Sequence, residues 1–437
     1  MANTDQEIAP LSKNDDQPSD SSICIPEDLE PGPGCCIYEV PSRFREANQK
    51  AFTPQLISIG PIHHGNTNLA RMERQKQMYY KKFQRKTSEK TLKDFKSYIE
   101  RNVRRIGRCY DAQSVYMLEA PELIEIVSHD AVFIIMLFLR DWMEKQLYTT
   151  NDEEEGDYYD FPFLRVKLLT DLMLIENQLP FFVLEDLYKL AFLNSCQHSF
   201  LDLACSYFSV KENPSFEERK IKHFTDLIRY QVLRACSLET RSYVGKHNMH
   251  SATKLREADV QFRCIVCRDG FGESIGVMFN GVSYNCYKIG DYEYEDVDFI
   301  EDVPESAAYG LLQVRFDKRV LELLTIDVEY ETEIRFRNLM AFEQYHYPKE
   351  AYFCSYIKLL DSFVDTDEDV NYLVEKGIIV NKLGSNKAVA DMINNLAVGV
   401  VHSTMLYGEI GMKLNERYKS SWNRGWAKLK HVYFNDL

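Results

Sequence analysis

The spacing of apolar residues changes near residue 250, and this change limits the fold more than any other feature. Before it, apolar residues recur at helical spacing, as in Leu92, Phe95 and Ile99. After it, the stretch 260–266 alternates and carries β-branched residues, which is typical of a strand. The sequence therefore predicts a mainly α (α+β) fold, a multi-helix domain with a small antiparallel β-sheet inserted in its second half.

The predicted elements share clear apolar periodicity and end at polar, Gly or Pro residues. Helices are expected twice within 66–108, then at 119–147, 163–176, 181–193, 199–209, 216–237, 332–346, 350–362, 366–375 and 386–397, and strands at 260–266, 275–279 and 320–328. The helix at 119–147 is apolar around most of its circumference, so we expect it to be central and buried.

Composition divides the chain into four parts. Residues 1–34 are acidic and polar and end in a Pro-Gly-Pro-Gly run, which predicts a disordered arm. Residues 35–250 form the helical part of one domain, and residues 251–418 form the small β-sheet and further helices of the same domain. Residues 419–437 form an amphipathic tail with Trp and Lys.

Charge and cysteine content indicate an intracellular protein. The 437-residue chain has a net charge of −15, which repels nucleic acid and anionic lipid at long range. Its 11 cysteines are an odd number and lie mostly in apolar stretches, as reduced, buried thiols do. No signal peptide and no membrane-spanning segment is apparent. We expect a cytoplasmic protein, or one held peripherally at the plasma membrane.

The tail has the composition of a membrane interface. Trp422 and Trp426 begin an apolar stripe at helical spacing within 419–434, and Lys428 and Lys430 flank it. Such a helix could rest on a membrane surface. It could equally be a terminal helix that docks on the protein core through its tryptophans, and the sequence does not decide between the two.

The segment 53–65, which reads TPQLISIGPIHHG, contains the first group of candidate site residues. These are Gly60, Pro61, His63, His64 and Gly65. Adjacent histidines on extended backbone point to opposite faces, so both cannot easily bind one metal ion. We favour a structural role, with the imidazoles hydrogen-bonded to backbone in the turns, over a metal-binding or acid–base role.

The segment 174–185, which reads LIENQLPFFVLE, contains the second group, namely Glu176, Asn177, Gln178 and Pro180. A functional interpretation makes Glu176 a general acid or base with an amide as oxyanion partner. We favour a structural interpretation, in which the two amides bond the backbone groups that Pro180 leaves free. A buried Glu176 paired with Arg43 or Arg45 would fit either interpretation.

No residue is assigned a catalytic, cofactor-binding or metal-binding role. The pattern Cys264-x-x-Cys267 lies on a predicted strand, where the two thiols point to opposite faces, and neither a second Cys-x-x-Cys nor a following pair of histidines accompanies it. Motifs of zinc peptidases and P-loop proteins are absent from the sequence. No cofactor is expected.

The segment 71–108 is basic within an acidic chain. It holds fourteen Lys and Arg residues against four Asp and Glu residues, with tyrosines between them. A solvated helical face is the simplest interpretation, followed by a surface for an acidic partner or anionic lipid. Nucleic acid is the least favoured partner.

Several motifs in order resemble the large plant family catalogued as domain of unknown function 247, over roughly residues 36–435. They include IYEVP at 37–41, TPQLISIGPIHHG at 53–65, DAVFII at 130–135, the segment 171–185, SATKLREA at 251–258, RNLMAFEQ at 337–344 and GII at 377–379. The resemblance implies a mostly helical domain and, typically, a C-terminal transmembrane helix at the plasma membrane. The family has no established enzymatic activity and no agreed catalytic motif, so no catalytic residue is carried over.

The family resemblance also implies a class of function. Some grass members resemble pollen-side specificity components of self-incompatibility, and others are linked to fertility or stress. This sequence departs from the family pattern at its end, because Tyr433-Phe434 is followed only by Asn435-Asp436-Leu437 and not by a spanning segment. We therefore expect no stable membrane insertion.

Three functions remain open at this point. The leading hypothesis is a non-enzymatic recognition or signalling protein that acts through protein partners, possibly at a membrane surface. The second is an uncharacterised enzyme whose pocket is lined by His63, His64, His129 and Glu176. The third is anion or nucleic-acid binding through 71–108. The sequence does not indicate an oligomeric state.

Overall fold

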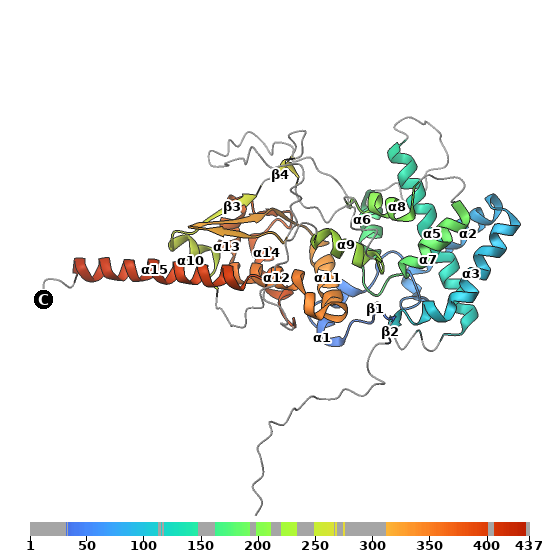
Figure 1. The fold of residues 1–437 in the computed structure, drawn as a ribbon, viewed down its shortest axis with the longest axis horizontal. Helices are drawn as coiled ribbons and strands as arrows, with labels where there is room; N and C mark the ends of the chain where they lie inside the picture. The colour runs from blue at the N-terminus through green and yellow to red at the C-terminus, as the bar shows by residue number, and fades with distance from the viewer. Residues whose placement is uncertain are drawn as a thin grey trace, which may run out of the picture.

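The fold was analysed in a computed structural model. The structure describes residues 32, 34–111, 115, 118–146, 162–192, 198–210, 220–233, 249–265, 267–268, 274–275, 312–400 and 406–433. Most of the predicted disordered arm, the acidic loops at 152–157 and 291–305, and the predicted strand residues 276–279 lie outside this part of the chain. The described residues are mainly helical with short strands, which confirms the predicted fold class (Figure 1).

The first hydrophobic core is made by helices around one long apolar helix. The helices are α2 (Ala70–Lys86), α3 (Glu89–Gly107), α5 (Ala120–Gln146), α6 (Pro162–Asp171), α7 (Phe181–Phe192), α8 (Phe200–Tyr207) and α9 (Phe224–Leu233). α2, α3, α7 and α8 all pack against α5. Phe133 and Phe138 of α5 are completely buried, and Phe138 stacks on Tyr207 with ring centroids 4.4 Å apart. The prediction of a central, buried helix is therefore confirmed.

The second core combines helices with short strands. Its helices are α10 (Ala252–Glu257), α11 (Thr332–His346), α12 (Tyr352–Phe363), α13 (Asp367–Glu375) and α14 (Asn386–Leu396), and its strands are β3 (Gln261–Ile265), β6 (Arg315–Asp317), β7 (Val320–Leu324), β8 (Ile326–Val328) and β9 (Ile379–Asn381). The single-turn 3-10 helix Pro348–Glu350 joins α11 to α12. α11 matches its predicted bounds, and α13 begins where the acidic residues predict, with a capping box between Thr366 and Asp369.

The sheets of this second part are mixed, which corrects the expectation of a wholly antiparallel sheet. β6 and β7 pair antiparallel, joined by the tight turn at Lys318 and Arg319. β3 and β7 pair parallel, and so do β8 and β9. Parallel strands require a long connection, and the chain between Ile265 and Val320 is long enough to supply one. A separate antiparallel pair joins β4 (Cys267–Arg268) and β5 (Ser274–Ile275).

An N-terminal segment, residues 35–52, joins the two cores. It contains β1 (Ile37–Tyr38), α1 (Ser42–Arg45) and the 3-10 helix Gln49–Phe52, and β1 pairs parallel with β2 (Tyr110–Asp111) beside the first core. Phe44 and Phe52 pack with Phe342 of α11 in a small third core. We call residues 35–52 the bridging segment, because one side of it contacts the helical part and the other side contacts α11.

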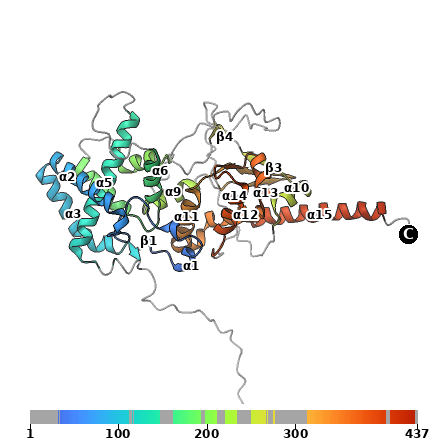
Figure 2. The same cartoon turned by 180° about the vertical axis from the view of Figure 1, so that it is seen from behind.

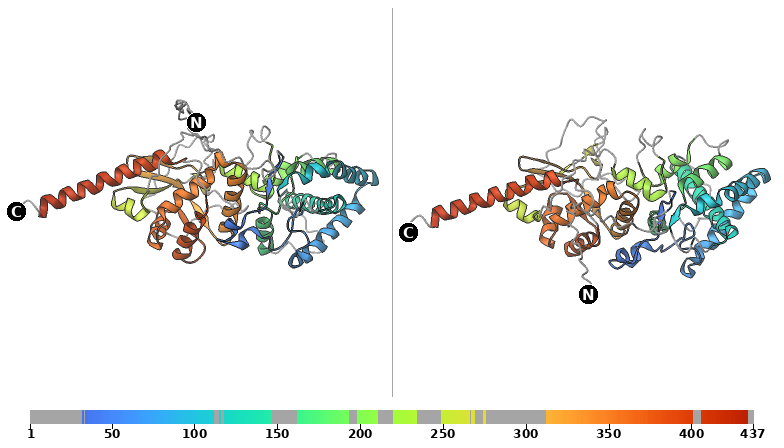
Figure 3. Two further views of the ribbon diagram at one scale, coloured as in Figure 1. Left: turned by 90° about the horizontal axis from the view of Figure 1, so that it is seen from below. Right: turned by 60° about the horizontal axis from the view of Figure 1, so that its bottom comes forward.

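The C-terminal helix α15 (Gly408–Tyr433) starts beside β6 and runs away from the body (Figures 1 and 2). Two further views show the same arrangement (Figure 3). Its second half therefore extends beyond the other described elements. Among the helices that the structure describes, none combines the length and apolar character needed to cross a membrane.

The contact between the bridging segment and the first core depends on a buried histidine. His223 Nε2 lies 2.9 Å from Cys36 O, its ring meets the edge of Phe342, and its Nδ1 has no hydrogen-bond partner among the described residues. Burial lowers the pKa of His223 to about 3. The imidazole is therefore neutral in the folded protein, and Nε2–H donates to the carbonyl.

This histidine predicts a pH-dependent loss of stability. In the unfolded chain the imidazole has an ordinary pKa of about 6.5, so below that pH it is protonated in the unfolded state and still neutral in the folded state. The stabilising contribution of the neutral imidazole is therefore present above pH 6.5 and is lost as pH falls toward 3. Between pH 7 and pH 5, the free energy of unfolding of wild type should fall by about 2 kcal/mol more than that of His223→Gln. Urea unfolding at both pH values measures it, and a difference that is independent of pH would contradict the assignment.

Candidate functional site

The two motif segments of the sequence lie against each other in the first core. The carboxylate of Asp171 accepts hydrogen bonds from three successive backbone amides, those of Gln55 at 3.0 Å, Leu56 at 2.6 Å and Ile57 at 2.9 Å. Asp171 is almost completely buried, and burial raises its pKa to about 6, whereas the three amides oppose the shift. The sequence analysis did not propose Asp171 as a site residue, although the family segment 171–185 begins with it.

The helix before this motif is shorter than predicted. α6 ends at Asp171, whereas the sequence predicted a helix to residue 176. Side chains from the second motif explain the difference, because they bond carbonyls that a longer helix would have used. Gln178 Nε2 donates to Leu172 O at 2.6 Å and to Leu174 O at 2.7 Å. The chain from 172 to 180 therefore crosses the core as irregular backbone, with some of its polar groups paired by main chain and others by side chains.

Asn177 and Gln178 are completely buried, and their side chains bond the backbone. Asn177 Oδ1 accepts from the amide of Ile59 at 2.7 Å, and its Nδ2 donates to Ile57 O at 3.0 Å. Gln178 Oε1 accepts from the amide of Phe224 at 3.0 Å. Both carboxamides thus use donor and acceptor atoms on main-chain groups, and neither is open to a substrate; the groups they bond do not include the carbonyl of Glu176, which a helical Pro180 would leave free. Pro180 directly precedes α7, which begins at Phe181.

Gly60 lies where the two motifs come closest. Its φ of +72° is in the left-handed region, and a Cβ built on it would stand 2.4 Å from the carbonyl oxygen of Gln178. The same carbonyl accepts a hydrogen bond from the Tyr110 hydroxyl at 2.9 Å. The amide of Gly60 donates to Asp130 at 2.7 Å. Only a residue without a side chain fits here, since any Cβ would collide with backbone.

A buried ion pair anchors the first motif to α5. Lys76 Nζ lies 2.5 Å from Asp130 Oδ1 and donates to Ser58 O at 2.9 Å, and Glu73 approaches Lys76 Nζ to 2.7 Å. Lys76 and Asp130 are both almost completely buried. Burial raises the pKa of Asp130, and the ammonium of Lys76 opposes that shift. The charges are therefore matched inside the core, which is the condition for burying them.

Glu176 connects the second motif to the bridging segment. Its carboxylate is completely buried and forms a bidentate pair with Arg45, which is the partner that the sequence suggested, together with Arg43, as alternatives. Glu176 Oε1 also accepts from the amide of Val40 at 2.5 Å, and His63 Nε2 lies 3.0 Å from Oε2. Arg43 instead lies over the ring of Phe44. Glu176 is thus enclosed by Arg45, His63 and backbone.

The histidines predicted for an enzymatic pocket do not surround Glu176. Among the contacts that the structure describes, His63 reaches Glu176, whereas His64 is exposed. The ring of His129 packs against Tyr80 in a T-shaped arrangement, with ring centroids 4.7 Å apart. Burial lowers the pKa of His129. Pro61 is buried beside Gly60, and Gly65 has open space around it. The arrangement supplies a closed polar contact between chain segments, without an open cleft at Glu176.

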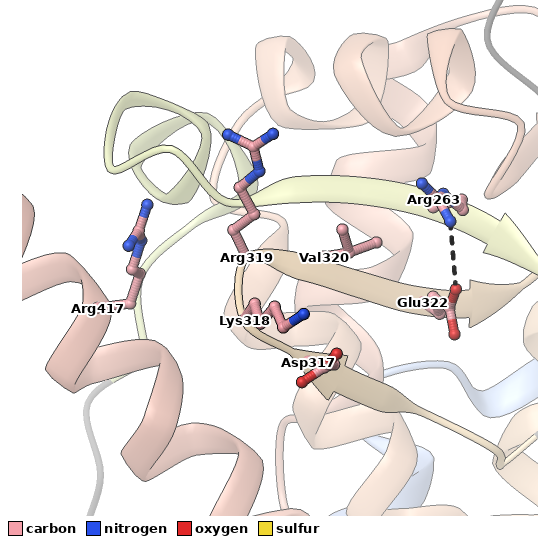
Figure 4. Close-up of a pocket in the computed structure, with 7 residues that line it drawn as sticks. All are labelled: Arg263, Asp317, Lys318, Arg319, Val320, Glu322 and Arg417. Atoms are coloured by element: carbon pink, nitrogen blue, oxygen red, sulfur yellow. Dashed lines mark ion pairs between the residues drawn. The ribbon is translucent and has the colours of Figure 1, made fainter.

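A hollow lies elsewhere on the molecule. It has a volume of about 470 Å³ at the root of α15 and is lined by Arg263, Asp317, Lys318, Arg319, Val320, Glu322 and Arg417 (Figure 4). Although it looks suited to anions, its arginines already have carboxylate partners. Arg263 pairs with Glu322 at 3.7 Å, and Arg319 and Arg417 both pair with Asp259. An anion would have to displace these carboxylates, so we assign it no ligand.

The predicted membrane-contact residues lie on α15. Trp422, Trp426, Lys428 and Lys430 fall in the part of the helix that extends from the body, but their side chains are outside the described set. Contact with a membrane surface therefore stays a prediction. Among the described residues, no group of three or more His, Cys, Asp and Glu side chains is placed to hold a metal ion.

Helices α2 and α3 form a strongly basic face. Thirteen of the fourteen Lys and Arg residues in 71–108, all of which the structure describes, are exposed, and Lys76 is the one that is buried. α2 packs on α5, and α3 packs on α5 and α7, through their apolar residues. Arg105 stacks on the ring of Phe182 at 3.7 Å, which fixes one cation at the edge of this surface. We call the exposed Lys and Arg residues of 71–108 the basic face.

A pair of glycine substitutions tests the contact between the motifs. Gly60→Ala should destabilise the protein by roughly 4 kcal/mol or more, because its Cβ would collide with the backbone at Gln178 and because its φ is positive. Gly65→Ala is the matched control, since Gly65 also has a positive φ (+80°) but has nothing within 4 Å of its Cβ position. The control should cost only about 1–2 kcal/mol. Urea unfolding midpoints measure both, and equal losses would show that the close approach is unimportant.

Comparison with known proteins agrees with the motifs. A family model described as a plant protein of unknown function, domain of unknown function 247, matches residues 37–437. The chain is similar to the UPF0481 protein At3g47200 of Arabidopsis thaliana, with 26% identity over 92% of this chain and 80% of that protein. It is also similar to the UPF0481 protein At3g02645 of the same plant, whose name carries the word putative, with 22% identity over 91% of this chain and 84% of that protein. No solved structure matches. The chain belongs to the plant family of domain of unknown function 247.

Proposed function

We propose that this protein is a non-enzymatic recognition or signalling protein that acts through protein partners. The main support is the use that the fold makes of the motif residues. Glu176, Asn177 and Gln178 are completely buried, and their polar atoms bond main-chain groups or Arg45. Residues in this setting hold chain segments together and are poorly placed to meet a substrate. The functional contacts are therefore expected on the surface.

The basic face is the surface that we propose for a partner. The single observation that carries this proposal is that thirteen cations of 71–108 are exposed while the exposed acidic residues of that segment are Glu89, Asp94 and Glu100. The segment has an excess of ten positive charges, so the other residues carry a net charge of −25, against −15 for the whole chain. Such separation of charge favours binding of an acidic protein surface and orients the approach of that partner.

The same charge distribution argues against a nucleic-acid partner. A duplex or a long single strand extends well beyond a two-helix face, so its phosphates would meet the acidic remainder of the chain. A compact acidic patch on a protein can contact the basic face without that repulsion. The signalling role and a role in self-incompatibility or fertility stay predictions of the family resemblance.

Zero-length coupling of amines to carboxylates tests the proposal directly. We expect a carbodiimide, applied to plant cells that express the tagged full chain, to link lysines of the basic face to carboxylates of another polypeptide. Changing Lys81, Lys86, Lys90 and Lys96 to Gln should reduce the linked partner roughly tenfold, because each charge at such an interface contributes up to about 1 kcal/mol.

A matched control keeps the same change in net charge. It replaces the exposed Lys254, Lys349, Lys376 and Lys387 by Gln and should leave the linkage intact. Equal loss in both variants would show that the effect comes from net charge alone. Links only to acidic segments of this same chain, or a complex that dissolves on nuclease treatment, would contradict binding of an acidic protein partner.

Contact with a membrane surface is a second candidate function, and the direction of α15 supports it. The helix continues to Tyr433 after it has left the body, so the segment with Trp422 and Trp426 is carried outward on regular helix (Figure 3). Tryptophans flanked by lysines suit the headgroup region.

Fractionation of plant cells tests the membrane candidate. We expect the full chain to sediment partly with membranes and a version that ends at Lys419 to stay in the supernatant. Extraction of the full chain by high salt or alkaline carbonate would agree with surface binding. If the two versions fractionate alike, the tail is not a membrane contact.

A further inference from the structure

Two cysteines meet where the bridging segment pairs with the first core. Cys36 immediately precedes β1 and Cys109 immediately precedes β2, and the amide of Cys36 donates to Cys109 O at 2.9 Å. Because the next residues, Ile37 and Tyr110, are register partners, Cys36 and Cys109 face each other across parallel backbone. Adjacent strands lie about 4.8 Å apart, which is within the Cα separation that a disulfide requires. Both residues are buried, and Cys109 Sγ lies 3.4 Å from Arg105 O.

We propose that Cys36 and Cys109 form a peroxide-sensitive dithiol that closes to an intrachain disulfide. The pair is a modification site, and it is independent of the proposed partner binding. Other described cysteines lack this arrangement. Cys354, for example, is also buried but lies in helix α12 and not in a pair of strands. Cys35 is the neighbour of Cys36 in sequence, but its thiol donates to the Ile37 carbonyl at 3.8 Å.

The surroundings give the two sulfurs different roles. The pKa of Cys109 lies below its ordinary value, first through its interaction with the Cys36 thiol and then because Arg105 and Lys222 are near, although burial opposes the shift. The pKa of Cys36 is raised by its interaction with Cys109 and by burial. Burial raises the pKa of Cys35 to about 12. Cys109 therefore supplies the thiolate, which is the reactive form, and Cys36 supplies the second thiol.

The reaction requires hydrogen peroxide or another hydroperoxide as oxidant. The Cys109 thiolate attacks one peroxide oxygen, the O–O bond breaks, and hydroxide leaves, so that Cys109 becomes a sulfenic acid. The Cys36 sulfur then attacks the Cys109 sulfur, the S–O bond breaks, and the departing hydroxide takes the Cys36 proton to form water. The proton that Cys109 lost on ionisation converts the first hydroxide to water. Two sulfurs are thus each oxidised by one electron, and one peroxide is reduced to two waters. A dithiol reductant reverses the change.

The cross-link would secure the contact between the two cores. Beyond Cys36 the bridging segment is held by Tyr38, whose hydroxyl lies 2.8 Å from His346 Nδ1 of α11, and by the pair of Arg45 with Glu176. A disulfide at Cys36 fixes the near end of this segment to the chain after α3. It closes a loop of the intervening residues 37–108, which restricts the unfolded chain.

Peptide mapping of the full chain tests the proposal. The folded protein is treated with hydrogen peroxide, free thiols are alkylated, and the protein is digested without reduction. We expect a peptide pair joined through Cys36 and Cys109 that disappears after reduction with dithiothreitol. The thermal midpoint of the oxidised protein should rise by roughly 5 °C and return on reduction. Oxidation of the folded chain without this linkage would overturn the proposal, as would linkage of Cys109 to Cys35 in its place.

Single substitutions separate the two roles. In Cys36→Ser, a 1,3-dione reagent should trap the sulfenic acid at Cys109, whereas in Cys109→Ser no sulfenic acid should appear at Cys36. Cys354→Ser is the control and should cross-link as wild type does. Trapping at Cys36 rather than Cys109 would contradict the assignment of roles. Circular dichroism checks that each variant is folded, and the wild-type peptide map decides the proposal if one of them is not.

Discussion

The close approach of Gly60 to the carbonyl of Gln178 is the contact on which the remainder of the fold depends. At this point two irregular segments cross inside the first core, where an unpaired amide or carbonyl costs about 1–3 kcal/mol. The structure meets that cost with side chains. Asp171 binds three amides of the first segment, and Asn177 and Gln178 bond the backbone on both sides. The motifs that mark the family thus pair main-chain groups that no helix or sheet could pair at that place.

The same contact positions the bridging segment and, through it, the second core. Glu176 accepts hydrogen bonds from the amide of Val40 and from the guanidinium of Arg45. Asn338 of α11 accepts a hydrogen bond from the amide of Ile175 at 3.0 Å and donates one to Ala51 O at 2.7 Å. A further buried pair, Arg229 with Glu343 at 3.1 Å, joins α9 to α11. The cores therefore share polar contacts that are satisfied only when both are in place. Such contacts favour one relative placement more strongly than apolar packing alone would.

Exposed charge is distributed differently from the charge of this interior. The buried charges are matched by partners, whereas the exposed cations of α2 and α3 exceed the exposed anions beside them. A surface of one sign on a protein of the opposite net charge acts at long range, and it is weakened by salt. Interior pairing accounts for the buried motif residues Glu176, Asn177 and Gln178, and the basic face is the surface that we propose for a partner.

Local pattern by itself determined the mainly α character of this chain and most helix positions, including α11 at Thr332–His346 and the start of α13 at Asp367. These features follow from periodicity and capping, which act over a few residues. It also indicated that Asn177 and Gln178 bond backbone and that Glu176 meets an arginine. Only the tertiary structure decided that the arginine is Arg45, that α6 stops at Asp171, that β3 runs parallel to β7, and that Cys36 lies beside Cys109. Each of these features depends on contacts between residues far apart in the chain. The free energy of such contacts selects the structure, and a pattern of neighbouring residues carries no information about it.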